Sequence, residues 1–340
     1  MNIMWHAVRR WRDRLAEAAP PRFTDLSTEG AVAARAAALA ALNDDALDTV
    51  ARVDVRPFPS AVVVCARTVF TAPLEWCAVL LGRGTEVVLK MPAGEPGWAP
   101  DLVAAAEAEH LPLSWTDARE VVGRHPLVIA MGSDAAVADI RRTVSPTARV
   151  LAHGHRFSAA WITRSESWTD VARDLAMYDT RGCMSPAVVF TPLPLDDALD
   201  ELAVAMARAE ERWPRGRLAG IEGATLRSRT ALSRAVGQSR VGYGWALHVL
   251  PGDQLEPTPL PRASTVVAVA DRREAMDLLS AHRAWLSTVG TDDPESAEAW
   301  LDAGACRVCR PGQMQRPPLV RMHDGENWLV ASGRAVWSEV

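Results

Sequence analysis

AVVVCARTVFTAPLEWCAVLLGRGTEVVLK, residues 61–90, places two short apolar runs on either side of a segment with helical spacing. The runs AVVVCA (61–66) and EVVLK (86–90) are rich in β-branched residues and do not alternate with polar ones, which is typical of buried parallel strands. The segment between them, residues 71–84, ends in glycine, as helices often do. The stretch therefore predicts a strand, a helix and a second strand that together form one βαβ unit.

The same alternation continues on both sides of a break near residue 154. The first 52 residues have helical spacing, and a second series of strands and helices follows residue 155. We expect an α/β fold with mainly parallel sheets, divided into an N-terminal domain, residues 1–154, and a second domain, residues 155–340. Expected strands are 111–115, 126–132, 148–154, 158–163, 187–191 and 264–270, and expected helices are 100–110, 116–123, 134–142, 167–178, 195–213, 271–284 and 294–303. The proline-rich residues 251–263 are expected to form a surface loop.

The composition favours a globular protein that acts on small molecules. The 340 residues are 49% hydrophobic and 23% charged, and the net charge of -5 argues against a general nucleic-acid binder. The N-terminus lacks the apolar core of a signal peptide, and no run of 18 apolar residues free of charge and proline suggests a membrane span. The five cysteines are odd in number and irregularly spaced. We therefore expect a cytoplasmic protein with reduced thiols.

Three loops follow the carboxyl ends of expected strands, where ligands bind in parallel sheets. They come after residue 66, after Lys90 and at Met131-Gly132-Ser133-Asp134. Gly132 and Ser133 offer free amides and a hydroxyl to a phosphate, although an ordinary turn with serine as the helix N-cap explains them equally. The dinucleotide pattern G-x-G-x-x-G is absent.

Lys90 is the single lysine among 37 lysines and arginines. A compact ammonium fits a narrow slot beside a hydroxyl or phosphate, from which a planar guanidinium is excluded. Lys90 is therefore a candidate nucleotide ligand. The alternative is chance in an arginine-rich composition.

The cysteines fall into three groups. Cys65 and Cys77 lie inside apolar patterns, where a free thiol behaves as a small hydrophobe. Cys306 and Cys309 form C-x-x-C, but no further ligands stand at a suitable spacing, so no metal site is predicted. Cys183 lies on a loop between Arg181-Gly182 and Met184-Ser185-Pro186, where a partly exposed thiol beside an arginine is a candidate nucleophile. A structural thiol in a turn is the alternative.

Four segments resemble, in order and rough spacing, those of the aldehyde dehydrogenase superfamily: EVVLKMPAGEP (86–96), MGSD (131–134), LAHGHRFS (151–158) and YDTRGCMSPAVVFT (178–191). Within it they look most similar to the acyl-CoA reductases of bacterial bioluminescence fatty acid reductases. The resemblance runs from about residue 60 to about residue 325. It implies an aldehyde dehydrogenase-like fold with two Rossmann-like domains, the first binding NAD(P) and the second carrying the catalytic cysteine.

The resemblance also implies site residues. It gives Lys90 the place that contacts the adenosine ribose and any 2′-phosphate, Gly132 and Ser133 the start of the helix facing the pyrophosphate, and Cys183 the place of the nucleophile. Relatives that prefer NAD carry an acidic residue where this chain has Ala93. We therefore expect NADPH as the cofactor, with NADH possible.

Two positions depart from the superfamily pattern. Thr68 stands near the asparagine of the oxyanion hole, and its hydroxyl has a shorter reach. His153 stands in the segment that holds the glutamate base of hydrolytic relatives. The absence of that base suits a reductase, because water would destroy the acyl-enzyme. His153 itself either moves protons or is a histidine with a satisfied hydrogen bond. The N-terminal region is also shorter than in relatives.

Together these features predict NADPH-dependent reduction of an acyl thioester to an aldehyde through an acyl-cysteine. The acyl group would come from acyl-CoA or an acyl carrier protein. The alternatives are a CoA-acylating aldehyde dehydrogenase that runs in the oxidative direction, a degenerate member without turnover, and a C-x-x-C redox or metal protein. The resemblance further implies a homo-oligomer and an acyl-transferring partner enzyme.

Overall fold

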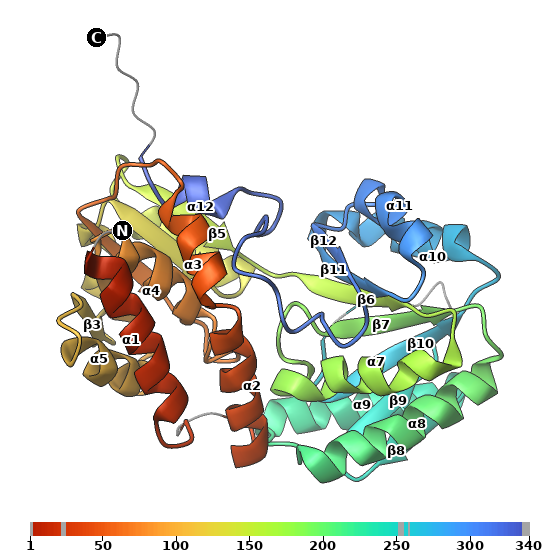
Figure 1. Cartoon of the computed structure of the whole chain (residues 1–340). Coiled ribbons are helices and arrows are strands. Elements are labelled where there is room, and N and C mark those ends of the chain that lie inside the picture. The colour runs from red at the N-terminus through yellow and green to blue at the C-terminus, as the bar shows by residue number, and fades with distance from the viewer. Residues whose placement is uncertain (1–2, 22–24, 251–254, 258, 335–340) are drawn as a thin grey trace. The chain divides into compact units, whose positions relative to one another are not determined.

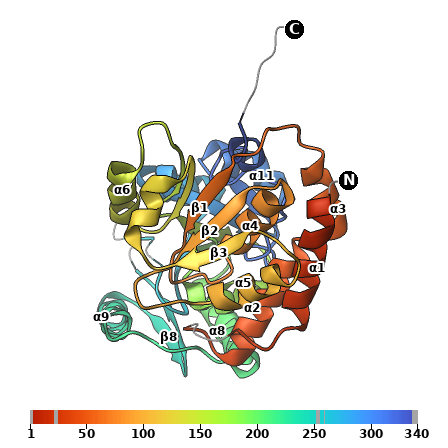
Figure 2. The same ribbon diagram turned by 90° about the vertical axis from the view of Figure 1, so that its left-hand side faces the viewer.

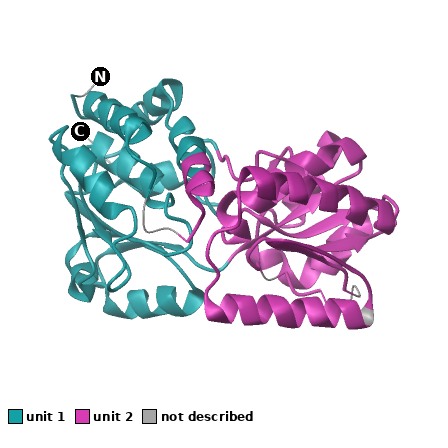
Figure 3. Ribbon diagram, turned by 90° about the horizontal axis from the view of Figure 1, so that it is seen from below, with its two compact units in different colours: residues 1–24, 34–155, 318–340 teal, residues 25–33, 156–317 magenta. Residues whose placement is uncertain are grey.

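The computed structural model describes residues 3–21, 25–250, 255–257 and 259–334 (Figure 1). The chain divides into two compact units. Unit 1 comprises residues 1–24, 34–155 and 318–340, and unit 2 comprises residues 25–33 and 156–317 (Figure 3). The expected boundary at 154/155 lies beside the one between the units, but the segment after residue 317 packs with unit 1 instead of the second domain. The expected surface loop at 251–263 lies partly outside the described residues.

The described residues of unit 1 form a parallel sheet of five strands in the order β3-β2-β1-β4-β5. Apolar β-branched side chains fill its centre, where Val62 pairs with Val88 and Val128. The strand order reverses between β1 and β4, which is the place where doubly wound sheets bind ligands. The strands are β1 Ser60–Val64, β2 Glu86–Lys90, β3 Leu113–Thr116, β4 Leu127–Met131 and β5 Arg149–His153.

Helices cover both faces of this sheet (Figure 2). On one face lie α1 Ile3–Glu17, α3 Asp44–Ala51, α4 Pro73–Gly82 and α5 Ala99–Glu107; on the other lie η1 Arg119–Arg124 and α6 Asp134–Thr143. Gly82 permits close packing of α1 on α4, because a Cβ there would lie 2.3 Å from the Trp5 ring. Two further helices are α2 Thr28–Ala40, which belongs to unit 1 from residue 34 onward, and α12 Trp328–Ala331.

The described residues of unit 2 form a sheet of seven strands in the order β12-β11-β6-β7-β10-β9-β8. All neighbours are parallel except β8 and β9, which form an antiparallel hairpin at one edge. The strands are β6 Phe157–Trp161, β7 Pro186–Thr191, β8 Ser239–Gly242, β9 Trp245–His248, β10 Ala263–Ala268, β11 Leu286–Thr291 and β12 Arg307–Cys309.

An apolar core lies on each face of the second sheet (Figure 1). One core packs α7 Trp168–Ala176 and α8 Leu195–Arg212, and the other packs α10 Arg272–Leu279 and α11 Ala297–Asp302. Helix α9 Gly220–Val236 packs against the β8–β9 hairpin. Short 3₁₀ turns are η2 Ser165–Ser167, η3 Met177–Thr180, η5 Ser280–Trp285 and η6 Pro294–Ser296. No helix among the described residues is long and apolar enough to cross a membrane.

Candidate active site

The predicted cofactor residues lie along one edge of unit 1. Lys90 ends β2 and pairs with Val64 at the end of β1, while Gly132 and Ser133 follow the end of the neighbouring strand β4. Thr68 is exposed in the loop after β1. Three adjacent strands thus bring these four residues to the carboxyl edge of the sheet at its switch point.

Lys90 and Ser133 lie toward the same face of this sheet. Val88, two residues before Lys90, packs with Ile140 of α6, so strand alternation directs Lys90 to the α6 side. Ser133 is the N-cap of α6, and its hydroxyl accepts the Ala136 amide at 3.3 Å. The free amides of this ten-residue helix make its N-terminus favourable for a phosphate. The negative charge of Asp134 in the first turn repels an anion at this N-terminus. Its carboxylate already accepts a hydrogen bond from the His155 amide at 2.7 Å.

A carboxylate that the sequence interpretation missed lies beside the loop after Lys90. The Gly94 amide donates to Asp117 at 3.3 Å, and Asp117 follows the end of β3. An acidic side chain therefore lies close to position 93, although Ala93 itself is not acidic. The spacing of Asp117 after strand residues 113–116 was the signal that could have revealed it.

His153 lies in a buried polar cluster of unit 1. Its Nδ1 is 2.7 Å from an Asp324 oxygen, and its ring stacks on His323 with centroids 4.1 Å apart. Arg321 binds both oxygens of Glu75 at 2.7 and 2.8 Å. Burial raises the pKa of Glu75, but the charge and hydrogen bonds of Arg321, together with the nearby His323 and His153, outweigh burial and lower that pKa. These contacts attach the segment after residue 317 to α4, which explains why it belongs to unit 1.

The same cluster sets the protonation of its histidines. Burial lowers the pKa of His323 to about 4, so its imidazole is neutral near pH 7. The Asp324 carboxylate can act only as an acceptor toward His153 Nδ1 when it is ionised, at 2.7 Å. His153 Nε2 is buried and has no hydrogen-bond partner among the described residues.

Among the described residues, one group of potential metal ligands is close together: His153, His323 and Asp324, with donor atoms within 4.8 Å of one another. The two imidazole planes are only 20° apart and stacked. Because the lone pair of each ring nitrogen lies in its ring plane, stacked rings do not direct their donors to a common point. The arrangement fits a hydrogen-bonded cluster better than a metal centre.

Cys183 lies in a turn of unit 2 just before β7. It is half-buried, its carbonyl accepts the Ser158 hydroxyl at 2.6 Å, and the Ser185 amide donates to Gly182 at 3.1 Å. Tyr178, Asp179 and Thr180, which lie three to five residues before Cys183, have left-handed φ angles of 60°, 52° and 56°. Each such residue costs about 1–2 kcal/mol, so the surrounding structure must hold this turn in place.

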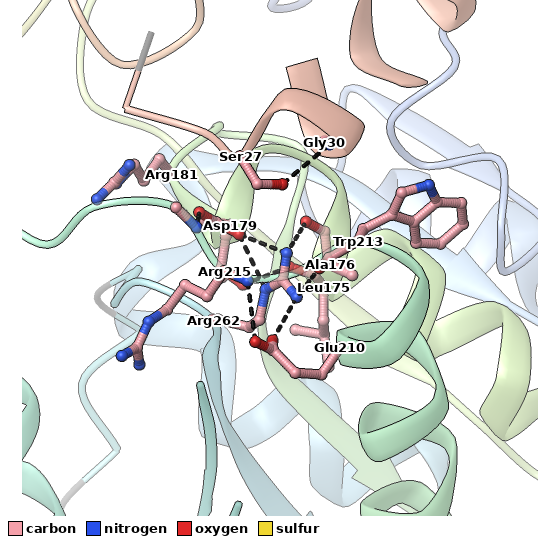
Figure 4. A network of polar contacts seen from close by, with 12 residues as sticks. Ser27, Gly30, Leu175, Ala176, Asp179, Arg181, Glu210, Trp213, Arg215 and Arg262 are labelled. Carbon is pink, nitrogen blue, oxygen red and sulfur yellow. Dashed lines mark hydrogen bonds and ion pairs between the residues drawn. The ribbon is translucent and has the colours of Figure 1, made fainter. Parts of the chain in front are cut away.

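Arg262 holds the strained turn (Figure 4). Its buried guanidinium contacts Asp179 at 2.6 and 2.9 Å, Glu210 at 2.7 Å and the carbonyls of Ala176 and Trp213. Its own amide donates to the Asp179 carbonyl at 2.8 Å, and Asp179 also accepts the Gly216 amide at 2.9 Å. Asp179 and Arg262 therefore fix the backbone that carries Cys183.

The expected effect of Arg181 on the Cys183 thiol requires correction. The Arg181 side chain is only 4% exposed, and its guanidinium binds both oxygens of Glu222 at 3.1 and 2.9 Å. It also donates to the carbonyls of Asp25 and Arg217. Because Glu222 neutralises this charge, Arg181 anchors the loop and is not a free cation beside the thiol.

The other cysteines differ from Cys183. Cys65 and Cys77 are buried as predicted; burial raises the pKa of Cys65 to about 12 and also raises that of Cys77. Burial also raises the pKa of Cys309 to about 11. These three thiols therefore stay protonated near neutral pH.

Comparisons with known proteins agree with this architecture. Residues 118–331 match the family model described as acyl-CoA reductase (LuxC), a range that includes His153 and Cys183 but not Thr68 or Lys90. No curated protein matches the chain.

Solved structures share the fold at low sequence identity. An oxidoreductase from Marinobacter aquaeolei has a TM-score of 0.77 and 12% identity, covering 98% of this chain and 85% of that one. An NAD-dependent aldehyde dehydrogenase from Sinorhizobium meliloti has a TM-score of 0.72 and 14% identity, covering 91% of this chain and 73% of that one. An NADP-dependent glyceraldehyde-3-phosphate dehydrogenase from Bacillus halodurans C-125, complexed with NADP, has a TM-score of 0.71 and 14% identity. The match covers 94% of this chain and 80% of that one. These similarities confirm the expected aldehyde dehydrogenase-like fold of two α/β units.

Proposed function

Because the chain belongs to the LuxC family of acyl-CoA reductases, we propose that it reduces an acyl thioester to an aldehyde with NADPH, through an acyl-cysteine on Cys183. The observation that carries the proposal is the family match across the Cys183 turn. The strained backbone before Cys183 supports it, because such strain is concentrated at functional sites. Acyl-CoA and an acylated carrier protein are both candidate donors.

The residues of unit 1 fit a dinucleotide. Lys90 and the N-terminus of α6 lie toward one face at the switch point of the sheet, where the first offers a cation and the second offers amides to phosphates. When bound, the nicotinamide supplies a hydride to the acyl carbon. NADPH is proposed because Lys90 suits a 2′-phosphate and position 93 has no carboxylate. Asp117 beside Gly94 is the feature that favours NADH as the alternative.

The side chains of the protein carry the other steps. The Cys183 thiolate attacks the thioester carbonyl, the C–S bond to the leaving thiol breaks, and an acyl-cysteine forms. After hydride transfer, the thiohemiacetal collapses to the aldehyde and the Cys183 thiolate is released. The Thr68 hydroxyl and the Cys183 amide are the proposed donors to the oxyanions. His153 is the proposed acceptor or donor of the proton that the leaving thiol requires.

Intact mass spectrometry tests the proposal. An acyl-CoA should add the mass of one acyl group to the protein, and NADPH should remove it as aldehyde. The Cys183→Ala variant should accept no acyl group, whereas Cys306→Ala, another half-buried thiol, should behave as wild type. Acylation or NADPH-linked turnover in Cys183→Ala would exclude the mechanism. Faster turnover with aldehyde, CoA and NADP than in the reductive direction would favour the oxidative alternative.

A further inference from the structure

A cavity in unit 2 is lined by none of the residues of the candidate active site. Its volume is about 370 Å³, within the range of small-molecule sites. Helix α9, the β8–β9 hairpin and the loop before α9 form its walls. The lining residues that carry the argument are Arg215, Arg227, Arg234, Thr230, Tyr243 and Trp245.

The charged side chains that line the cavity are all basic, and the nearest carboxylate described, that of Glu210 behind Gly244, is paired with Arg262 at 2.7 Å. Arg215, Arg227 and Arg234 line it, and no acidic residue does. In the described part of the chain these three guanidinium groups have no ion-pair partner, and the Nε of Arg215 is buried without a hydrogen bond. Figure 4 shows the Arg215 guanidinium pointing away from Glu210, which accepts only its backbone amide, at 3.0 Å. Three uncompensated guanidinium groups predict an anionic ligand.

Two arginines close to the cavity do have acidic partners. On the same helix Arg229 pairs with Glu256 at 3.0 Å, and on β8 Arg240 pairs with Asp200 at 2.6 Å. Arg227, Thr230 and Arg234 are spaced by three and four residues, so they share one face of α9. Arg215, Arg227 and Arg234 thus line one cavity, whereas Arg229 and Arg240 are paired outside it.

The cavity also offers flat apolar surface. Trp245 lines it, and Tyr243 at the tip of the hairpin is 93% exposed. Gly244, with φ +93°, shapes this tip. An exposed aromatic ring beside arginines can stack on a planar base, while the guanidinium groups bind phosphates in a bidentate manner. The combination is suited to a phosphorylated nucleotide.

We propose that this cavity binds the phosphorylated adenosine end of coenzyme A, and the proposal rests on the function proposed above. Coenzyme A carries several phosphates and an adenine, and its long pantetheine arm separates them from the reacting thioester. Helix α9 connects the cavity with the Cys183 turn within unit 2, because Glu222 in its first turn binds Arg181, two residues before Cys183. Arg227 is five residues further, roughly 8 Å along the helix axis.

Titration calorimetry with adenosine 3′,5′-bisphosphate tests the proposal without requiring turnover. The double variant Arg227→Glu/Arg234→Glu should weaken binding at least about tenfold, because charge-assisted contacts to phosphate are lost. The control Arg208→Glu/Arg273→Glu changes the net charge equally at exposed residues of unit 2 outside the cavity and should bind as wild type. The site would be refuted if both double variants weakened binding equally, or if neither of them weakened it.

Kinetics separate this inference from the proposed function. The cavity variant should raise KM for an acyl-CoA about tenfold at unchanged kcat, and leave KM for the matching acyl-pantetheine, which lacks the nucleotide, unchanged. A rise in KM for NADPH alone would assign the cavity to the cofactor, and a rise only for an acylated carrier protein would assign it to that protein; either overturns the proposal. If no thioester is reduced, the proposed function fails, while the calorimetry still decides whether the nucleotide binds.

Discussion

Lys90 and Asp117 carry opposite charges and lie at the carboxyl edges of adjacent strands in unit 1. Lys90 pairs in register with Thr116, the residue before Asp117, across β2 and β3. A 2′-phosphate on the cofactor would be attracted by the first and repelled by the second, whereas a free ribose hydroxyl can donate to a carboxylate. In the proposed cofactor site, the preference between NADPH and NADH would therefore depend on the balance of these two residues.

Replacing each residue should move this balance in a known direction. Lys90→Arg should raise KM for NADPH several-fold, because a guanidinium is wider than an ammonium, and should leave acylation of Cys183 intact. Asp117→Asn should increase the ratio of kcat/KM for NADPH to that for NADH, because a repelling charge is removed. Steady-state kinetics with both cofactors measure the two effects. An unchanged KM in Lys90→Arg would mean that the single lysine has no role in cofactor binding.

At the scale of elements, the turn η3 depends on one buried arginine. Arg262→Lys retains the charge but cannot reach Asp179, Glu210 and two carbonyls together, since a lysine lacks the guanidinium fork. We expect unit 2 to lose about 3 kcal/mol of unfolding free energy, measured by calorimetry. We also expect a changed rate of iodoacetamide labelling at Cys183.

The matched control is Arg229→Lys on α9. Its pair with Glu256 leaves that carboxylate 72% exposed, so the stability loss should stay below about 1 kcal/mol. Labelling of Cys183 at the wild-type rate in Arg262→Lys would show that the turn keeps its shape without the arginine fork.

The sequence predicted elements with strong periodicity and missed those without it. The strands of unit 1 and β6, β7 and β10 were predicted within a few residues, because most of them are short apolar runs. Strand β11, LSTVGT, is fully buried yet rich in small polar residues, and α9 contains two glycines and several arginines, so neither shows a clear pattern. The expected helix at 116–123 is a 3₁₀ turn at 119–124.

The candidate site was predictable only where it is local in sequence. Lys90 and Ser133 lie in or shortly after such runs, and Cys183 lies just before one. Asp179 and Arg262 are 83 residues apart, and the contact of His153 with Asp324 spans 171. Pairs at such distances in the chain are determined by the folded sheet and leave no local pattern.

At the scale of the whole molecule, the two units contain buried groups that titrate in opposite senses. In unit 1, burial lowers the pKa of His323 to about 4. In unit 2, burial raises the pKa of Asp174 to about 7, although the Gly312 amide, 2.6 Å away, opposes the shift. Each folded unit thus favours the neutral form of its group.

The stabilities of the two units should therefore diverge as the pH falls from 7 to 5. His323 takes up a proton below about 6.5 only when unfolded, so unit 1 should lose about 2 kcal/mol. Asp174 is already protonated in the folded state below about 7 but is ionised in the unfolded state above about 3.8, so unit 2 should gain a similar amount. Hydrogen exchange of the slowest amides in each unit measures both changes. His323→Gln should abolish the loss in unit 1 alone and Asp174→Asn the gain in unit 2 alone; parallel changes in both units would show that these two groups do not control the pH dependence.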